Sequence, residues 1–492
     1  MEPPVVSHFE PFQCLRGITY ATLLLSSSYF GTLFFLMPLM PFAFLWPAVF
    51  RQIADFLIGF WLVLPSSLME LLFGVQIHVQ GDKVDKNRPA LLIMNHRTRL
   101  DWLFFWNALW RMDPWLLITG KISPKSMLMF IPGAGWAMAT NAFLFLERNF
   151  ASDQTRIDKI ISYYSRFERK YQLLLFPEGT DKCPIATERS QKFAEKNGLV
   201  QYKYLLHPRT LGFVHLLHKM RKEKYVDFVY DVTVAYGGRI IQSEMDLILR
   251  GLTPGHVYFL VKKISISSLP DKDEQLEKWL MEKWAEKEKT LHNFYASGEF
   301  SSPNANSDRD HQQNTLQKIG LSSRARLLQM VVLAVWLALT TIWAFIFFGV
   351  LSSKIRWLIA LFTAVYFVGL QLYYEKTLHN FYASGEFSSP NANSDRDHQQ
   401  NTLQKIGLSS RARLLQMVVL AVWLALTTIW AFIFFGVLSS KIRWLIALFT
   451  AVYFVGLQLY YGGFELFLAQ LAAARPTDES AKQKQSHRKK KQ

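Results

Sequence analysis

The chain has 492 residues, of which half are apolar and 15% aromatic, and its formal net charge is +17. Its mean hydropathy is only slightly positive, at +0.10. This balance suits neither a fully soluble enzyme nor a transporter with many membrane helices, and it is typical of a soluble-type domain carried on a few membrane segments. The two cysteines, Cys14 and Cys183, are too few for a disulfide framework.

The positive charge is distributed unevenly along the chain. Residues 1–75 are slightly acidic, with Arg16 and Arg51 against Glu2, Glu10, Asp55 and Glu70. The excess therefore lies in the centre and the C-terminal part, which favours contact with anionic lipid heads or phosphorylated substrates. Nucleic-acid binding is the weaker interpretation, because no zinc-ligand spacing, RNP-like aromatic motif or basic-region heptad accompanies the charge.

Residues 17–50 are almost wholly apolar and contain Pro38, Pro41 and Pro47. Because each proline removes a backbone donor from a helix, the pattern favours a broken or re-entrant pair hinged near residues 37–41, followed by an amphipathic arm over 51–74. A single membrane span is the alternative. In either case we expect residues 1–80 to form the N-terminal membrane-anchoring helices.

From residue 81 to 287 the pattern changes to short β-rich runs that alternate with helical stretches. This alternation predicts an α/β domain with a mixed sheet flanked by helices. The expected helices cover 100–111 and 153–170, and a surface helix over 272–293 closes the domain. The expected strands are 90–94, 143–146, 173–176, 229–235 and 257–261.

Residues 288–374 recur letter for letter as residues 375–461. Functional repeats diverge in sequence, so perfect identity indicates a recent duplication or an error in sequence assembly, and we favour the error. Each copy holds a polar linker and two apolar runs, which in the first copy are 327–351 and 357–374. Both runs are long enough to span a bilayer, so we expect a C-terminal transmembrane helical hairpin in each copy.

The first candidate catalytic segment, residues 89–102, is expected to form a strand, a loop and a helix. His96 would lie in the loop after the strand, where open α/β sheets place ligand sites. Asp101 would lie in the first turn of the helix, where a carboxylate is favoured. The loop can fold His96 back onto that carboxylate, which holds one ring nitrogen as a donor and leaves the other as a base. A pair without a Ser or Cys nucleophile would activate a hydroxyl group of the substrate.

The second candidate segment is a buried-strand run that ends in Pro177, Glu178, Gly179 and Thr180. A charged Glu followed by Gly at the end of a strand is costly if it is only structural. It is expected where the glutamate and the glycine backbone face a polar ligand. An ordinary strand-ending turn is the alternative.

Four motifs occur in the order found in glycerolipid acyltransferases of the 1-acylglycerol-3-phosphate type, and the chain resembles that family over residues 85–240. Residues 193–199 and 206–213 are similar to the lysocardiolipin acyltransferase branch. The motifs are Asn95-His96-x4-Asp101, Phe145-Leu-Glu-Arg148, Phe176-Pro-Glu-Gly-Thr180 and Leu206-His-Pro208-Arg-Thr210.

The resemblance implies an enzyme in which His96 is the general base on the acceptor hydroxyl and Asp101 orients it. Arg148 and Lys125 would bind the phosphate of the acceptor by charge-assisted hydrogen bonds. Backbone amides around the Gly179 turn are candidate donors to the oxyanion. The other residues expected to bind substrate are Asn95, Glu178, Gly179 and Thr180.

The partners implied are a lysophospholipid and acyl-CoA, which is a consumed cosubstrate, so no bound cofactor is expected. We expect no metal ion either, because His207, His215 and His218 lack carboxylate or cysteine partners at ligand spacing. No nucleic acid is expected to bind.

The sequence departs from the common family pattern at two positions. Asp181 follows the third motif where many members have arginine, and Ala142 stands where glycine is common. Both changes resemble the lysocardiolipin branch and favour a bulky phosphodiester acceptor of the lysocardiolipin, lysophosphatidylinositol or lysophosphatidylglycerol type. An enzyme that makes phosphatidic acid from 1-acylglycerol-3-phosphate is the alternative.

Residues 462–492 form a basic C-terminal tail that ends in Lys489-Lys490-Lys491-Gln492. This ending resembles the dilysine retrieval signal of endoplasmic-reticulum membrane proteins. We therefore expect that membrane, or its mitochondria-associated part, with the catalytic domain and the C-terminus facing the cytosol. A non-catalytic membrane scaffold with a degenerate acyltransferase domain is the rival hypothesis. A lipid hydrolase is disfavoured, because no Gly-x-Ser-x-Gly segment is present.

Overall fold

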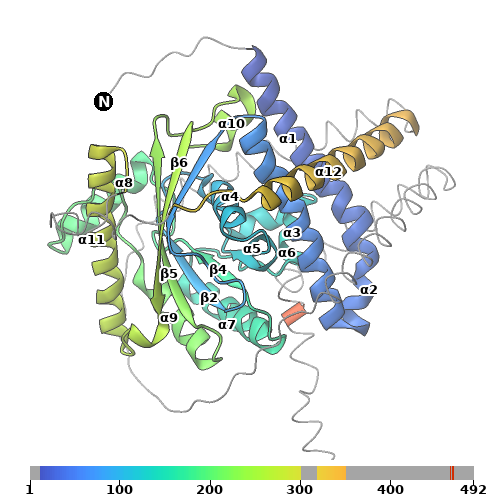
Figure 1. The fold of residues 1–492 in the computed structure, drawn as a ribbon. Helices are drawn as coiled ribbons and strands as arrows, with labels where there is room; N and C mark the ends of the chain where they lie inside the picture. The colour runs from blue at the N-terminus through green and yellow to red at the C-terminus, as the bar shows by residue number, and fades with distance from the viewer. Residues whose placement is uncertain (1–10, 301–317, 351–465, 467, 470–492) are drawn as a thin grey trace, which may run out of the picture. The chain divides into compact units, whose positions relative to one another are not determined.

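The structure is a computed structural model that describes residues 11–300, 318–350, 466 and 468–469 (Figure 1). The chain divides into two compact units, residues 1–341 with 449–492, and residues 342–448. The fold and the site below belong to the first unit.

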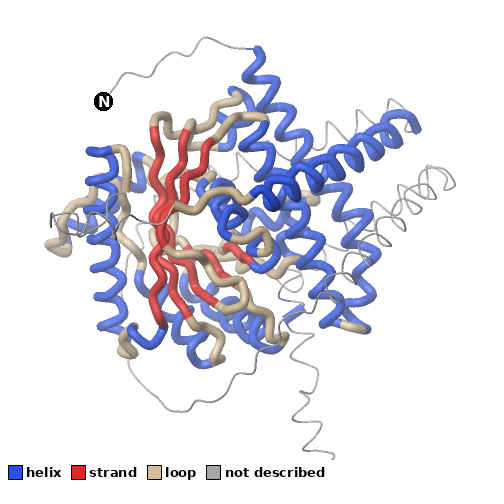
Figure 2. The backbone as a smooth tube through the Cα atoms, in the orientation of Figure 1, coloured by secondary structure: helices blue, strands red, loops and turns tan. Residues whose placement is uncertain are grey.

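A mixed sheet of six strands forms the centre of this unit, in the order β1-β6-β5-β2-β4-β3. Figure 2 draws the strands in red, with helices around them. Only β5 and β6 pair antiparallel; the other neighbours are parallel. The central strands β2 and β4 are buried along their whole length, as expected of parallel strands covered on both faces. The strands are β1 (Gln76–Gly81), β2 (Ala90–Met94), β3 (Gly120–Ile122), β4 (Gln172–Leu175), β5 (Phe228–Gly237) and β6 (His256–Ser265).

Helices cover both faces of the sheet. Figure 1 shows α8, α9 and α11 on one side and α4 and α5, with the N-terminal helices, on the other. The helices that follow β1 in the chain are α4 (Asp101–Met112), α5 (Leu116–Thr119), η2 (Ser126–Phe130), α6 (Ala134–Thr140), α7 (Phe150–Arg166), α8 (Pro184–Lys196), α9 (Thr210–Lys222), α10 (Glu244–Arg250), η3 (Ile266–Ser268), α11 (Asp273–Ser297) and α12 (Ser323–Val350).

The predicted mixed sheet flanked by helices is confirmed, but individual elements differ. Residues 143–146 form no strand; they run as a buried loop in which Leu144 N donates to Ile122 O of β3 at 3.2 Å and Leu146 makes an isolated bridge with Lys125. The short strands β1 and β3 escaped prediction because their patterns are weak. β1 extends the sheet to residue 76, and α11 continues beyond residue 287, so the predicted boundaries at 80/81 and 287/288 fall at the end of β1 and inside α11.

The N-terminal helices break at a different place from the one predicted. α1 (Pro11–Gly31) passes through a π-helical turn, η1 (Thr32–Leu36), into α2 (Met37–Leu45). The chain leaves helical geometry at Trp46, with φ −137° and ψ 72°, before α3 (Pro47–Leu71) begins. The expected hinge near 37–41 is therefore wrong: Pro38 and Pro41 both lie in continuous helical geometry, and the only irregularity beside them is the π-helical turn just before residue 37.

Close backbone contact holds α3 against the sheet domain. A Cβ atom on Gly59 would lie 2.6 Å from Ile118 Cγ1 and 2.7 Å from Ile118 Cα. Only glycine fits where α3 crosses α5 at this distance.

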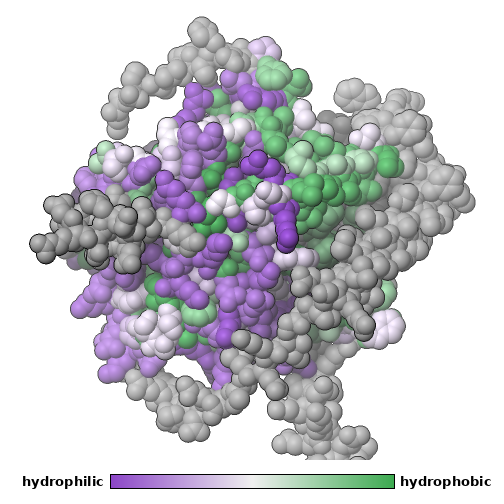
Figure 3. Space-filling model, viewed as in Figure 1, coloured by the Kyte–Doolittle hydropathy of each residue, from purple (hydrophilic) through white to green (hydrophobic). Residues whose placement is uncertain are grey.

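In the part of the chain that the structure describes, two helices, Pro47–Leu71 and Ser323–Ile342, are long and apolar enough to cross a membrane. They differ in how much of the apolar window the protein covers, 61% for the first and 33% for the second. Figure 3 shows apolar surface gathered over α12 and α1. The exposed side chains there include Phe12, Leu15, Ile18, Leu327, Leu328, Met330, Val331, Leu337 and Ile342. The predicted hairpin turn, its second run, the duplicate over 375–461 and nearly all of the basic tail lie outside the described residues.

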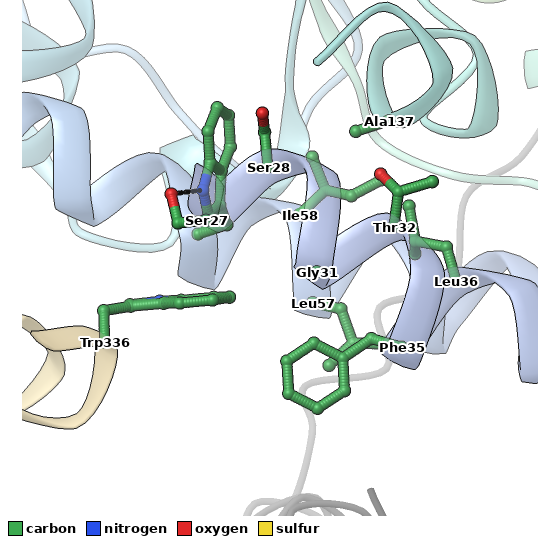
Figure 4. A pocket seen from close by; sticks show the side chains of 11 residues that line it. Ser27, Ser28, Gly31, Thr32, Phe35, Leu36, Leu57, Ile58, Ala137 and Trp336 are labelled. Carbon is green, nitrogen blue, oxygen red and sulfur yellow. Dashed lines mark hydrogen bonds between the residues drawn. The ribbon is translucent and has the colours of Figure 1, made fainter. Parts of the chain in front are cut away.

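A small cavity lies between α1, η1, α3 and α12 (Figure 4). It measures ≈ 20 Å³, which is enough for about one water molecule and far too small for an acyl chain. The hydroxyl groups of Ser27 and Thr32 are tied to neighbours: Trp61 donates to Ser27 at 3.0 Å, and Thr32 donates to Gly133 O at 3.0 Å. This cavity is therefore a packing detail of the N-terminal helices.

A buried ion cluster fixes α3 to the edge of the sheet. Asp55 of α3 pairs with Arg51 at 2.8 Å, with Lys121 of β3 at 2.9 Å and with Arg169 at 3.4 Å. Tyr171 donates its hydroxyl group to the same carboxylate at 2.6 Å. Asp55, Arg51 and Lys121 are fully buried, whereas Arg169 is about a third exposed, so one carboxylate compensates two cations that are cut off from water.

Asp55→Asn tests this cluster. The substitution leaves buried cations without an anion, which is expected to cost about 3–5 kcal/mol of unfolding free energy. Asp113→Asn is the matched control, because Asp113 and its partner Lys86 are both about a third exposed and such pairs contribute about 0–1 kcal/mol. Denaturant unfolding of the detergent-extracted chain measures both. Equal losses in the two variants would contradict this account.

Candidate active site

The candidate site lies at the edge of the sheet where parallel strands β2, β4 and β5 end. Because the three strands are neighbours and run in the same direction, the loops that follow β2 and β4 meet beside the end of β5. The loop after β2 carries His96, the loop after β4 carries Glu178, and the last residues of β5 include Tyr236. This edge is where open α/β sheets place their ligands.

His96 and Asp101 form the pair expected from the sequence. The Nδ1 atom of His96 lies 2.9 Å from Oδ2 of Asp101, at the start of α4. Asp101 is fully buried and His96 is 8% exposed. With Nδ1 held by the carboxylate, Nε2 is the ring nitrogen that can accept a proton.

The Asp101 carboxylate receives further hydrogen bonds besides that of His96. The Thr98 N–H group donates to Oδ2 at 3.0 Å, and the Thr98 hydroxyl group donates to Oδ1 at 3.1 Å. The Tyr236 hydroxyl group, from β5, also donates to Oδ1. Burial and the neighbouring Asp101 raise the pKa of Tyr236 well above its usual value, so the phenol stays protonated as a donor.

Two neighbours fix the position of His96 in its loop. The His96 ring stacks on Phe176 with centroids 4.1 Å apart and planes at 25°. The preceding residue, Asn95, forms two hydrogen bonds with the backbone of Val234. Asn95 Nδ2 donates to Val234 O at 3.1 Å, and Val234 N donates to Asn95 Oδ1 at 2.8 Å. The structure thus places both polar atoms of Asn95 against β5, whereas the sequence analysis expected this residue to bind substrate.

Glu178 is buried, and its carboxylate is surrounded by protein N–H groups. Oε1 accepts from His96 N at 3.3 Å and from Trp284 Nε1, of α11, at 3.2 Å; Oε2 accepts from Leu206 N at 3.3 Å. Burial raises its pKa to about 8, an effect opposed first by Trp284 and then by the two backbone amides and the charge of Lys287.

The Gly179 turn follows directly. Gly179 has φ +74°, a conformation that favours glycine, and a Cβ atom there would also press on the side chain of Arg209 at 3.1 Å. Its N–H group donates to Phe176 O at 2.9 Å. That amide is therefore used within the turn and is not the expected oxyanion donor. Thr180 is buried, with its hydroxyl group 3.5 Å from Asp181 Oδ1.

Three cations gather beside the His96 loop. Burial, and then the charges of Arg148 and Arg99, lower the pKa of Lys125 to about 8. Arg99 lies in the His96 loop itself, 3.9 Å from Asp181 and 3.7 Å from Glu244. The structure thus brings together the two predicted phosphate ligands, Lys125 and Arg148, and adds a third cation. Like charges held in one partly buried place favour the binding of an anion.

The histidines of residues 207–218 do not come together into a metal site. His207 contacts Ser190, His215 contacts Asp158 and His218 contacts Asp273. Among the residues that the structure describes, no group of three His, Cys, Asp or Glu side chains could hold a metal ion.

Four residues of this site were not predicted from the sequence: Thr98, Arg99, Tyr236 and Trp284. Thr98 had a local signal, since a threonine three residues before a helical Asp can form a reciprocal cap. Tyr236 and Trp284 had none, because their contacts depend on which strands and helices become neighbours. Together the site offers an oriented base beside an anion site, which suits the activation of a hydroxyl group on an anionic substrate.

Two protein-family models match the chain over the residues that form this site. Residues 76–237 match the family model described as Acyltransferase, and residues 247–336 match the model described as Acyltransferase C-terminus.

Three curated relatives show the extent of the likeness. Lysophosphatidylinositol acyltransferase 10 of Caenorhabditis elegans is 45% identical over 286 residues, which are 57% of this chain and 72% of that protein. Lysocardiolipin acyltransferase 1 of Gallus gallus is 41% identical over 283 residues, 58% and 74% of the two chains. The probable 1-acyl-sn-glycerol-3-phosphate acyltransferase 5 of Arabidopsis thaliana is 34% identical over 260 residues, 53% and 67% of the two chains.

Glu178→Gln tests the buried carboxyl group through the pH dependence of stability. The raised pKa means that the folded state holds this proton more tightly than the unfolded chain. The contribution of Glu178 to the unfolding free energy is therefore lost as the pH rises from about 4.5 to about 8, by up to about 1.4 kcal/mol per pH unit. Glutamine does not titrate, so the variant gains stability relative to wild type across this interval and the difference then levels off. Denaturant unfolding at several pH values measures the difference; one that stays constant with pH would contradict the assignment.

Proposed function

The chain belongs to the glycerolipid acyltransferase family and is an enzyme, and from that premise we propose that it transfers a fatty acyl group from acyl-CoA to the free hydroxyl group of a lysophospholipid. The observation that carries this proposal is the His96–Asp101 pair at the strand ends, 2.9 Å apart, beside the group of three cations. Two of the relatives described above are named as acyltransferases of lysophosphatidylinositol and lysocardiolipin.

In the proposed reaction His96 Nε2 takes the proton from the acceptor hydroxyl group. The hydroxyl oxygen attacks the thioester carbonyl carbon of acyl-CoA and forms a tetrahedral intermediate. When the intermediate collapses, the carbon–sulfur bond breaks and CoA leaves, taking the proton from His96. Asp101 holds the ring in the correct tautomer and stabilises its charged form, and Thr98 and Tyr236 fix the carboxylate in turn.

Lys125, Arg148 and Arg99 would bind the phosphate of the acceptor. Their position beside the His96 loop lets the phosphate hold the acceptor while its hydroxyl group reaches the base. Asp181 lies against Arg99 at 3.9 Å, so this part of the site is less positive than three cations alone would make it. We propose phosphodiester acceptors of the lysocardiolipin, lysophosphatidylinositol or lysophosphatidylglycerol type, and hence a role in phospholipid remodelling; 1-acylglycerol-3-phosphate is the alternative acceptor.

We also propose that the enzyme is embedded in the endoplasmic-reticulum membrane, or its mitochondria-associated part, with the catalytic domain in the cytosol, where acyl-CoA is present. The exposed apolar side chains of α1 and α12 support a membrane location. The Lys489-Lys490-Lys491-Gln492 ending supports the compartment.

The first test compares the full chain with His96→Ala and Asp101→Asn in membranes depleted of background activity. Each receives labelled oleoyl-CoA and a panel of lysophospholipids that includes lysophosphatidic acid, and the labelled diacyl product is measured. Loss of the base or its orienting carboxylate is expected to lower product formation by about 10²–10⁴-fold. His218→Ala is the control, because His218 is a partly exposed histidine of α9 paired with Asp273.

Acylation of one or a few acceptors by wild type and by the control, but not by His96→Ala, supports the mechanism and identifies the acceptor. Acylation of lysophosphatidic acid alone would favour the phosphatidic-acid alternative. A correctly inserted wild-type chain that is inactive on the whole panel would favour a non-catalytic scaffold and overturn the proposal.

Lys125→Arg tests the anion site through pH. Because the pKa of Lys125 is about 8, the wild-type side chain loses its charge above that pH and the KM for the acceptor is expected to rise. Arginine stays charged, so the KM of the variant should change little between pH 7 and about 9. Steady-state kinetics with the preferred acceptor measures both. The same KM profile in the two proteins would remove Lys125 from the phosphate site.

A further inference from the structure

We infer that helix α11 positions the catalytic base: Trp284 holds Glu178, and Glu178 holds the backbone of His96. The inference rests on the proposed role of His96, and it makes Glu178 and Trp284 positioning residues. Glu178 would then shape the site from behind the His96 loop instead of contacting the substrate, as the sequence analysis had expected.

The first observation is that the His96 peptide is held on both sides. Its N–H group donates to Glu178 Oε1 at 3.3 Å, and its carbonyl oxygen accepts from Lys182 N at 2.9 Å. Asp101 holds the ring separately. Glu178 and Lys182 both belong to the segment after β4, so that segment sets the height of His96 above the strand ends.

The second observation is that Glu178 is held by α11. Trp284 is completely buried, and its Nε1–H group donates to the same Oε1 atom that accepts from His96 N. The remaining oxygen accepts from Leu206 N. Each carboxylate oxygen therefore has a protein donor, and Glu178 is only 3% exposed. A buried carboxyl group with this many protein partners fixes the parts of the chain around it.

The third observation is that α11 itself is anchored at two further points, one on strand β5 and one on the segment at residues 203–205. Lys287 is fully buried, pairs with Asp231 of β5 at 2.5 Å and donates to Val232 O. Glu288 accepts from the backbone N–H groups of residues 203–205 at 2.6–3.1 Å. These contacts fix the height and rotation of α11 against β5, so Trp284 reaches Glu178 in one defined position.

Helix α11 lies outside the residues 76–237 that match the first family model and inside the residues 247–336 that match the second. Its inner face, however, reaches the His96 loop through Trp284 and Glu178. Tyr295 of the same helix also accepts from Tyr236 N at 3.4 Å, behind Asp101. The second segment is therefore expected to affect the rate of the chemical step as well as stability, because small displacements of a base lower the rate steeply.

The test measures kcat and KM of the full chain in membranes for Trp284→Phe, which keeps an aromatic ring but lacks the N–H donor. The kcat is expected to fall about tenfold, with KM for both substrates within about twofold, per molecule of folded protein. Trp279→Phe is the matched control: Trp279 lies on the same helix and stacks on Phe213, with centroids 5.9 Å apart. It should leave kcat nearly unchanged.

Glu178→Gln supplies a second variant that keeps the shape of the side chain. Its amide oxygen can still accept from Trp284 and His96, but the amide nitrogen cannot accept from Leu206, so a smaller fall in kcat is expected. Because Trp284 acts through Glu178, the variant that combines Trp284→Phe with Glu178→Gln should show a fall in kcat clearly smaller than the product of the two single falls.

The outcomes separate this inference from the proposed function. If His96→Ala is inactive but Trp284→Phe keeps the wild-type kcat per folded molecule, or only loses stability, α11 does not position the base. Independent, multiplying effects of the two substitutions would also overturn the inference. If His96→Ala itself retains activity, the proposed mechanism fails first, and with it the role assigned to His96.

Discussion

The site depends on how the Asp101 carboxylate is buried. A carboxylate removed from water is unfavourable unless hydrogen-bond donors surround it, and around Asp101 the donors are His96, Thr98 and Tyr236. Two of them come from the loop after β2, but Tyr236 comes from β5. The Asp101 carboxylate can receive the Tyr236 hydrogen bond only if β5 is the neighbour of β2. The orientation of the His96 ring therefore depends on the order of the strands.

The same logic extends one layer outward through Glu178. Its carboxylate joins three segments that are distant in the sequence: the His96 loop, the Leu206 segment and helix α11. Burial makes the charge of such a group costly, and its donors offset that cost. The two family segments, 76–237 and 247–336, are thereby linked at one buried carboxyl group directly behind the catalytic loop.

The two apolar helices, α3 and α12, differ in how far the protein covers them. α3 turns Arg51 and Asp55 into the protein, where Lys121 and Arg169 complete the cluster, and it approaches α5 closely at Gly59. α12 leaves most of its apolar window uncovered. α3 therefore serves as part of the wall of the catalytic unit, whereas the apolar surface of α12 and α1 is what a bilayer would cover. Length and hydropathy alone describe the two helices alike and do not reveal this difference in burial.

The sequence by itself determined the mixed α/β sheet, the strands β2, β4, β5 and β6, and the His96–Asp101 pair. These features depend on local patterns: apolar β-rich runs, and a loop–helix segment in which His and Asp come into reach without help from the rest of the chain. It also predicted that Lys125 and Arg148 share one site, through the resemblance to a family. Tertiary structure alone decided which groups Glu178 and Asn95 contact, since their partners lie in other segments of the chain. It alone placed Tyr236 on Asp101 and Trp284 on Glu178, because which strand or helix becomes a neighbour is settled by packing over the whole domain. Local patterns did not show which of the three prolines would interrupt the helix, and the structure places the break at Trp46, directly before Pro47. They also did not show that residues 143–146 form a buried loop, because an apolar run can be buried without becoming a strand.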